Sequence, residues 1–451
     1  MGGYIMELKL DQKTAFDKIK IFLKQPPGGM FLLGGSAGTG KTFLTNNIVS
    51  YIKSTSNKKI AVTAPTHKAL KVLKKFIEGK VHFSTTHSIL GLKEVIDGYG
   101  NIKFKRQEYK DPPLIDYDIL IVDEASMIRD DIFKDIAYFT NTGKKVIFIG
   151  DPYQIPPVGR KNSIVFEKEA RSQYNIQSAR LEYIIRQEQE HPILQVADSL
   201  KKGILKPSPL MEKRSNSNPL GEVRFASRED ENELFSEILP FFGDDTFKND
   251  PDYIKIIAWR NKTVDYYNQM VRNYLFGENI PKIIPGEKLI IVNHPFVVEK
   301  QVLLSINEEL DVLEVTTDTF DVDENNKIKF YRVKVKAYQE TIYNEYSIDI
   351  IHEDSEQDYA DICYMLKNYA LHQKQGSTEA RMAWMDYYSF KRKWVDVSYN
   401  YAITAHKAQG STYNNAVVMW WDYITNKKIY ERNRVLYTAI TRPDTRLYII
   451  N

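Results

Sequence analysis

The sequence predicts an α/β protein built from two parallel-sheet domains, with a small hairpin-like insertion in the first and a β-rich insertion in the second. Short apolar runs alternate with helical periods through the first 150 residues, and the alternation resumes near residue 250 and again near the end. From about Pro285 to Phe390 the pattern changes to β-alternation, followed by a helical, aromatic-rich stretch. We therefore predict a first domain at 1–82 and 114–183, its insertion at 83–113, a second domain at 184–284 and 391–451, and its insertion at 285–390.

Composition describes an ordinary globular chain. Its 451 residues are enough for about three domains. Its contents of 43% hydrophobic and 27% charged residues exclude general disorder. The net charge of +3 is small, so a polyanionic partner would have to bind a local patch. Cys363 is the only cysteine, which excludes an intrachain disulfide and a thiolate metal cluster. No apolar run is long enough to span a membrane, and we expect a cytoplasmic protein.

The first domain is predicted from six segments in order. Strands are expected at "GMFLLGG", "KIAVTAP", "DILIVDE" and "KVIFIGD", and helices at "TFLTNNIVSYI" and "THKALKVLKKF". Such alternation is typical of parallel strands with helices on both faces of the sheet. The segment "DGYGNIKFKRQEYKDPP" interrupts it with a Gly-rich turn and a Pro-Pro stop, which predicts the hairpin-like insertion.

The second domain is predicted from fewer segments. "YIKIIAW" reads as a strand, and the next segment reads as a helix with Asn261 as its N-cap and Gly277 as its stop. "KIKFYRVKVKAYQ" is typical of a strand in the insertion. The segments "NNAVVMWW", "NRVLYTAIT" and "RLYIIN" then predict a strand, a helix and a strand.

The segment "GGSAGTGKT" carries the pattern G-x-x-x-x-G-K-T directly after a predicted strand and before a predicted helix. We expect Lys41 to reach the β- and γ-phosphates of a nucleotide and Thr42 to hold Mg²⁺. The alternative is a chance Gly-rich turn. Backbone N–H groups that wrap the phosphates are expected from the loop residues Gly35, Ala37, Gly38, Thr39 and Gly40.

Asp123 and Glu124 end the predicted strand "ILIV". Asp123 is placed to bind the Mg²⁺ already held by Thr42, and Glu124 to orient and deprotonate an attacking water. The pair could also be a strand end that meets solvent. We favour hydrolysis over phosphoryl transfer to another metabolite.

Gln154 lies in "GDPYQIPPV", after the next predicted strand. Parallel strands carry ligand groups at their carboxyl ends, so Gln154 is expected to face the γ-phosphate. Its amide does not titrate, so it would position water or report whether the phosphate is present, in a loop stiffened by proline. The alternative is a Pro-rich surface loop with an incidental Gln.

Nine collinear segments together resemble the superfamily 1 helicases, and within them the RecD/Dda branch. They run through nearly the whole chain: "LDQKTAF", the phosphate loop, "APTHKAL", "TTHSIL", "VDEASM", "GDPYQIPPV", "EYIIRQ", "ITAHKAQGST" and "LYTAITR". The resemblance implies two RecA-like domains, with the second insertion SH3-like and extended by helices.

The resemblance assigns further roles at the nucleotide site. It implies ATP with Mg²⁺ as cofactors, with Gln12 reading adenine and Gln154 coupling the γ-phosphate to the DNA groove. Arg186 and Arg442 look like arginines that enter the ATP site from the second domain and stabilise charge on the γ-phosphate. Arg442 could also serve as a cation at a helix C-terminus. Gly410 is expected among the nucleotide-binding residues, and Thr412 stands where many members have a Glu that contacts ribose.

Other matched segments resemble DNA-contact motifs. Phe104 aligns with an aromatic pin that would separate strands, and Trp384 and Tyr388 match aromatics of the helical extension thought to brace it. The alternative for Phe104 is a hairpin aromatic that packs inward. Phosphate or base contacts are expected from Thr66, His67, Thr85, His87, Thr404 and His406, although a single His is more often structural.

These observations predict an ATP-dependent DNA helicase that translocates on single-stranded DNA, with 5′ to 3′ polarity implied by the resemblance alone. The rivals are a translocase on DNA or RNA that separates no strands, a nucleotide-gated binding protein and a small-molecule kinase. The implied partners are single-stranded and fork DNA, with a single-stranded-DNA-binding protein or replication proteins as further candidates. The resemblance implies a monomer, in the bacterial host cytoplasm if phage-encoded.

Overall fold

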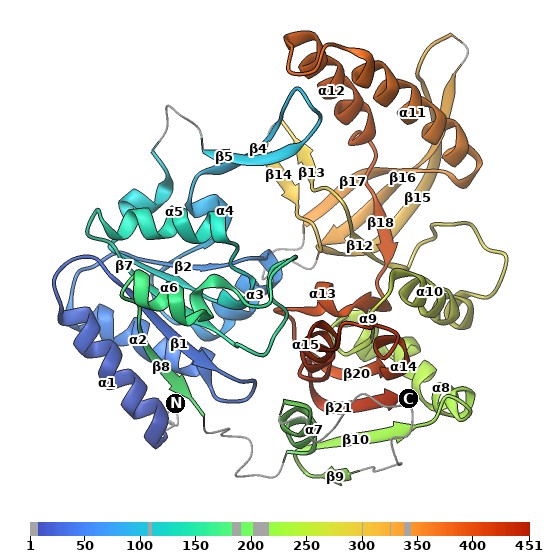
Figure 1. Ribbon diagram of the computed structural model, residues 1–451. Helices are drawn as coiled ribbons and strands as arrows, with labels where there is room; N and C mark the ends of the chain where they lie inside the picture. Colours follow the sequence, from blue (N-terminus) through green and yellow to red (C-terminus); the bar gives the residue numbers. More distant parts are fainter. Residues whose placement is uncertain are drawn as a thin grey trace. The chain divides into compact units, whose positions relative to one another are not determined.

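The computed structural model describes residues 8–106, 111–182, 191–201, 216–299, 301–324, 326–337 and 344–451. The chain divides into two compact units (Figure 1). The first comprises Met1–Gly91, Gln107–Val264 and Ala402–Asn451, and the second comprises Leu92–Arg106 and Asp265–Tyr401. Among the described residues, no helix is both long and apolar enough to cross a membrane.

The first unit contains a six-stranded sheet in the order β3-β2-β6-β7-β1-β8, in which every neighbouring pair is parallel. The four central strands are those that the apolar runs predict, because a strand covered on both faces is apolar throughout. The strands are β1 (Met30–Gly35), β2 (Ile60–Ala64), β3 (His82–Thr85), β6 (Ile119–Val122), β7 (Lys145–Gly150) and β8 (Gln177–Leu181).

Helices cover both faces of this sheet, as predicted. Alternate residues of β1, such as Phe31 and Leu33, pack on one face with the apolar side of α1, which presents Ile19 and Phe22. On the other face Phe133 of α5 lies 5.9 Å from Phe148 of β7, between ring centroids. The helices are α1 (Leu10–Lys24), α2 (Lys41–Thr55), α3 (His67–Phe76), α4 (Thr86–Ile89), α5 (Asp130–Thr140) and α6 (Lys168–Gln173).

A second six-stranded sheet completes the first unit, in the order β19-β11-β20-β21-β10-β9. Its pairs are parallel except for the β9–β10 hairpin. Its strands are β9 (Asn216–Asn218), β10 (Gly221–Ala226), β11 (Ile254–Ala258), β19 (Ala402–Thr404), β20 (Tyr413–Met419) and β21 (Pro443–Ile450). Its helices are α7 (Pro192–Lys201), α8 (Glu231–Gly243), α9 (Asp245–Asn249), α13 (Ala405–Ala408), α14 (Trp420–Tyr423) and α15 (Ile429–Ile440).

Helix α10 (Asn261–Phe276) leads from the first unit into the second. Gly277 follows its last residue with φ of +90°, as the sequence predicts. The prediction of Asn261 as N-cap is wrong, because Asn261 is already helical. Instead the buried carboxylate of Asp422 accepts hydrogen bonds from the N–H groups of Trp259 and Arg260, at 2.8 and 2.9 Å. A carboxylate from a distant segment thus fixes the backbone just before α10.

The second unit is built on a five-stranded antiparallel sheet, in the order β17-β16-β15-β12-β18, with the separate hairpin β13–β14. Its strands are β12 (Lys288–Ile291), β13 (Phe296–Val298), β14 (Gln301–Leu304), β15 (Glu309–Asp321), β16 (Lys327–Ala337), β17 (Asn344–Ile351) and β18 (Val397–Tyr399). Helices α11 (Glu356–His372) and α12 (Thr378–Lys391) lie in the sequence between β17 and β18. The strand predicted at "KIKFYRVKVKAYQ" is present as β16, and the description SH3-like stays a prediction.

The remaining part of the second unit is the hairpin of β4 (Leu92–Ile96) and β5 (Ile102–Arg106). The insertion predicted from Phe83 therefore begins later, because the first three of its residues belong to strand β3 of the first sheet. This hairpin packs against α12. The hydroxyl of Tyr388 donates to the carbonyl of Gly100 at 2.9 Å, and a Cβ on Gly100 would lie 2.5 Å from the Trp384 ring.

Candidate nucleotide and nucleic-acid sites

Three loops meet at the carboxyl edge of the first sheet. Strands β6, β7 and β1 are parallel neighbours, so the segments that follow them leave the sheet on the same side. Gly150 ends β7, and a Cβ there would lie only 3.0 Å from the backbone nitrogen of Ala125. The absence of a side chain at Gly150 lets the loop after β6 approach β7 closely.

The loop between β1 and α2 has the backbone of a phosphate loop. Gly38 and Gly40 both have φ of +77°, which a side chain would strain, and Gly40 immediately precedes α2. The ammonium of Lys41 donates to the carbonyls of Gly35 and Ser36, at 2.9 and 3.0 Å. Thr42 is the second residue of α2. The loop therefore presents a cation and a helix N-terminus together, which suits a phosphate.

Gln12 is fully buried on α1, and its side-chain N–H donates to the carbonyl of Thr39 at 3.0 Å. Its side-chain oxygen accepts from the backbone N–H of Lys9 at 3.2 Å. Gln12 thus supports the phosphate loop from the side of α1. Its contact with adenine stays a prediction.

Asp123 and Glu124 follow β6, and Glu124 has a left-handed backbone with φ of +51°. Burial raises the pKa of the Asp123 carboxyl, and the neighbouring Glu124 charge raises it further. Burial also raises the pKa of Glu124, against the opposing effects of Arg442 and Lys41. Two buried carboxyls side by side favour a cation between them and a phosphate.

A magnesium ion fits this donor set, because Mg²⁺ prefers hard oxygen ligands and usually keeps water and phosphate oxygens in its shell. Thr42 and Asp123 are the residues that would hold it. In the described part of the chain, no three or more His, Cys, Asp or Glu side chains lie close enough together to hold a metal ion by themselves.

The amide of Gln154 connects the two domains of the first unit. In the one orientation that satisfies both ends, its N–H donates to a carboxylate oxygen of Glu124 at 3.0 Å. Its oxygen then accepts from Nη2 of Arg442 at 3.3 Å. Arg442 is buried and also donates to the carbonyls of Thr438 and Ser411. The structure thus brings three predicted site residues into one hydrogen-bonded chain.

Sequence reasoning missed Tyr437, which lies on α15 near Arg442. Its hydroxyl donates to a carboxylate oxygen of the buried Asp151 at 2.9 Å and accepts from the backbone N–H of Ala37 at 3.0 Å. Burial and the Asp151 charge raise the pKa of Tyr437 well above its usual range. The signal that could have found it is its place inside the matched segment "LYTAITR".

Of two further predicted nucleotide residues, the structure describes only Gly410, whose contact with nucleotide stays a prediction. Gly410 lies beside α3, where a Cβ would be 3.1 Å from the Cβ of Ala69 and 3.8 Å from the hydroxyl of Thr66. The preceding Gln409, also missed by sequence reasoning, donates to the carbonyl of Ile155 at 3.3 Å. Arg186 lies outside the described residues.

The three predicted DNA-contact threonines share one structural role. Each is the residue just before a helix, and each side-chain oxygen accepts a hydrogen bond from a backbone N–H of the first turn. The pairs are Thr66 with Ala69 at 3.2 Å before α3, Thr85 with Ser88 at 3.2 Å before α4, and Thr404 with Lys407 at 3.3 Å before α13. Each hydroxyl proton therefore points away from its cap bond and can be donated to a phosphate.

The histidines of the same segments lie in or beside these first turns. Burial lowers the pKa of His67, His87 and His406 below the ordinary value of 6.5. These side chains are therefore neutral at pH 7.5, and each can donate one N–H or stack on a base.

Phe104 lies on β5 in the second unit, and 49% of it is exposed. About half of this residue is thus open to solvent, and its role as a pin stays a prediction. Trp384 is buried against the hairpin, and the guanidinium of Arg392 pairs with the carboxylate of Glu94 at 2.5 Å. A braced hairpin with an exposed aromatic is suited to contact a flat partner such as a base.

Family models match both domains of the first unit. The model described as an AAA domain matches residues 21–160, and the one described as a UvrD-like helicase C-terminal domain matches residues 399–450.

Relatives cover nearly the whole chain. It is 27% identical over 448 residues to the ATP-dependent DNA helicase dda of Enterobacteria phage T4, covering 97% of each protein. It is also 27% identical over 493 residues to an uncharacterized protein of Acanthamoeba polyphaga mimivirus, covering 97% of this chain and 98% of that protein. Over 174 residues it is 30% identical to the ATP-dependent RecD2 DNA helicase of Deinococcus radiodurans, covering 39% of this chain and 22% of that protein.

Among solved structures, the Pif1 helicase from Candida albicans aligns with a TM-score of 0.49 at 18% identity, over 99% of this chain and 95% of that chain. The two family models, the relatives that cover nearly the whole chain and the nine collinear segments agree, and together they support a superfamily 1B helicase.

Proposed function

We propose that the protein is an ATP-dependent DNA helicase that translocates on single-stranded DNA in the 5′ to 3′ direction. The observation that carries the proposal is the chain Glu124–Gln154–Arg442, which joins a candidate catalytic base in one domain to a guanidinium in the other. The full-length similarity to the phage T4 helicase supports DNA as the substrate. ATP hydrolysis that RNA stimulates more than single-stranded DNA would identify RNA as the substrate instead. Movement without strand separation would be an outcome of the unwinding test below.

In the proposed hydrolysis step, Lys41 and the loop N–H groups hold the phosphates of ATP. Bound Mg²⁺ would supply charge neutralisation at those phosphates, with Thr42 and Asp123 as its protein ligands. Glu124 accepts a proton from the attacking water. Arg442, with Arg186 as a second candidate, stabilises the charge that develops on the γ-phosphate.

The position of Gln154 supports coupling between ATP hydrolysis and movement of the two domains. Loss of the γ-phosphate changes the charge beside Glu124 and Arg442, so the amide between them is well placed to pass that change to the other domain. ATP would then act as the ligand that selects one relative position of the two domains. A DNA strand bound at the N-terminal caps of α3 and α4 in one domain and of α13 in the other would move with the two domains.

ATP turnover tests the enzymatic part of the proposal. Wild-type protein should hydrolyse ATP faster with single-stranded DNA, and Lys41→Ala and Glu124→Gln should both abolish turnover. Lys58→Ala, an exposed lysine of the same domain, serves as the control and should behave as wild type. Tight ATP binding without turnover in the wild type would instead identify a nucleotide-gated binding protein.

Strand separation is tested at the hairpin. Phe104→Ala should lower duplex unwinding while DNA-stimulated ATP hydrolysis stays at the wild-type rate. Tyr274→Ala removes an aromatic of the same 49% exposure from helix α10 and should leave unwinding unchanged. Normal unwinding by Phe104→Ala would show that this ring is not the pin.

A further inference from the structure

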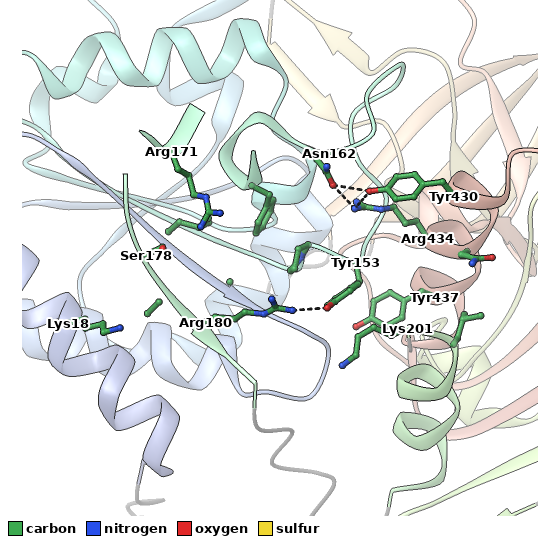
Figure 2. A pocket seen from close by; sticks show the side chains of 17 residues that line it. Lys18, Tyr153, Asn162, Arg171, Ser178, Arg180, Lys201, Tyr430, Arg434 and Tyr437 are labelled. Carbon is green, nitrogen blue, oxygen red and sulfur yellow. Dashed lines mark hydrogen bonds between the residues drawn. The ribbon is translucent and has the colours of Figure 1, made fainter. Parts of the chain in front are cut away.

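A pocket lies in the first unit, beside the nucleotide site (Figure 2). It has a volume of about 660 Å³, within the range of small-molecule sites. Its walls come from strands β1 and β8, the loop after β7, and helices α7 and α15. None of the residues assigned above to ATP or Mg²⁺ lines it.

The pocket is strongly cationic in a protein that is nearly neutral overall. Among the 17 described residues that line it, none is Asp or Glu, and five carry positive charge: Lys18, Arg171, Arg180, Lys201 and Arg434. Two carboxylates outside the pocket wall pair with these cations. Oδ1 of Asp198 lies 2.8 Å from Nζ of Lys201, and Oε1 of Glu182 lies 3.9 Å from Nε of Arg180. The other three cations have no carboxylate at ion-pair distance in the described part of the chain. Concentrated positive charge in a concave site attracts anions.

Two polar atoms in the pocket wall are buried without a partner among the described residues. They are Nε of Arg171, a donor, and Oδ1 of Asn433, an acceptor. Buried polar groups are almost always hydrogen-bonded, and an unmade bond on a guanidinium is unfavourable. A ligand with phosphate oxygens and a hydroxyl group could satisfy both.

Tyrosine rings lie among the cations. The guanidinium of Arg180 is 5.7 Å from the centroid of the Tyr153 ring and donates to its hydroxyl at 2.7 Å. The guanidinium of Arg434 lies 4.6 Å from the ring of Tyr430 on the opposite wall. Amphipathic rings beside guanidinium groups suit a ligand that joins a phosphate to a planar or sugar part.

Arg434 also connects this pocket to the hydrolysis site. Its Nη1 donates to the backbone carbonyl of Gln154 at 3.0 Å, and its Nη2 donates to the side chain of Asn162 at 2.6 Å. A ligand that bound Arg434 would therefore act on the loop that carries the Gln154 amide.

We propose that this pocket binds a small phosphorylated anion of about the size of a nucleoside monophosphate, as a site additional to the ATP site. Arg171 and Arg180 contact the phosphate from the first domain, and Arg434 contacts the ligand from α15. Occupancy stabilises the contact between α15 and the Gln154 loop.

The test is a calorimetric titration of AMP into the full chain already saturated with Mg²⁺ and a non-hydrolysable ATP analogue. The prior titration of the analogue reports on the ATP site by itself, so failure of the proposed function and failure of this site give different results. We expect one further AMP per chain. Adenosine, which lacks the phosphate, should not bind, and ribose 5-phosphate should bind more weakly than AMP.

Variants identify where the AMP binds. Arg180→Gln should weaken it by about tenfold, whereas Arg180→Lys, which keeps the charge, should weaken it much less. Arg180 has a half-exposed side chain, so its replacement should not affect folding. Arg171→Gln should show the same loss, and Lys248→Gln, a distant exposed lysine, should bind as wild type.

Three results would overturn the proposal. The first is the absence of AMP binding at millimolar concentration, which would make this an ordinary hydrated cleft. The second is AMP binding that disappears when the analogue is present, which would make the pocket the outer part of the ATP site. The third is binding of equal strength in wild type, Arg171→Gln and Arg180→Gln.

Discussion

Replacing Gln154 by Ala removes the amide that joins Glu124 to Arg442 without altering the phosphate loop. The amide makes two hydrogen bonds to charged partners, at 3.0 and 3.3 Å. A hydrogen bond to a charged group contributes about 1.5–3 kcal/mol, and each 1.4 kcal/mol is about tenfold in rate. If one of these bonds is stronger while the γ-phosphate is being transferred than in the ATP-bound ground state, by about the worth of one such bond, kcat for ATP hydrolysis should fall about 10- to 100-fold.

The assay is steady-state ATP hydrolysis with and without single-stranded DNA, together with DNA affinity in the presence and absence of an ATP analogue. For Gln154→Ala the KM for ATP should change by no more than about threefold, since a transition-state contact leaves substrate binding intact. The dependence of DNA affinity on the nucleotide should be lost. Gln25→Ala, an exposed glutamine of the first domain, is the matched control. A rise in KM with kcat and coupling unchanged would make Gln154 an ordinary ligand and refute the reasoning.

Three further outcomes follow from contacts in the structure. Tyr437→Phe should lower the free energy of unfolding by about 1–3 kcal/mol in urea titrations, because the buried Asp151 carboxylate loses a donor, and unchanged stability would contradict this. Tyr388→Phe removes the bond to the Gly100 carbonyl and should lower unwinding more than ATP hydrolysis, whereas equal losses would argue against bracing of the hairpin. At pH 7.5, replacing any one predicted DNA-contact histidine by Gln should leave the slope of log Kd against log salt concentration unchanged, because a neutral side chain releases no counterion. A slope smaller by about one would show that the histidine makes a charged contact. The histidines concerned, whose pKa burial lowers, are His67, His87 and His406.

The interior strands could be predicted from sequence because burial on both faces makes them apolar throughout, as in "FLLGG" and "ILIV". Edge strands were missed for the opposite reason. Strand β3 reads "HFST" and strand β8 reads "QSARL", and such half-exposed segments resemble loops by composition. The start of the hairpin insertion was misplaced because β3 was not recognised.

The phosphate loop and the Asp123–Glu124 pair could be predicted because nucleotide chemistry restricts the residue types and their spacing. Tyr437 could not be assigned a role in this way. Its partners Ala37 and Asp151 are 400 and 286 positions away, and only the folded chain brings them together. The same holds for Asp422, which fixes the backbone just before a helix that begins 161 residues earlier in the sequence.

Helicase activity and its polarity are measured most directly by the unwinding of duplexes that carry either a 5′ or a 3′ single-stranded tail, with and without ATP. We expect the wild-type protein to separate the 5′-tailed duplex in an ATP-dependent reaction and to leave the 3′-tailed duplex intact. The Glu124→Gln variant should separate neither duplex. Unwinding of only the 3′-tailed substrate would contradict the proposed polarity. ATP hydrolysis stimulated by single-stranded DNA, with neither duplex opened, would contradict the assignment as a helicase.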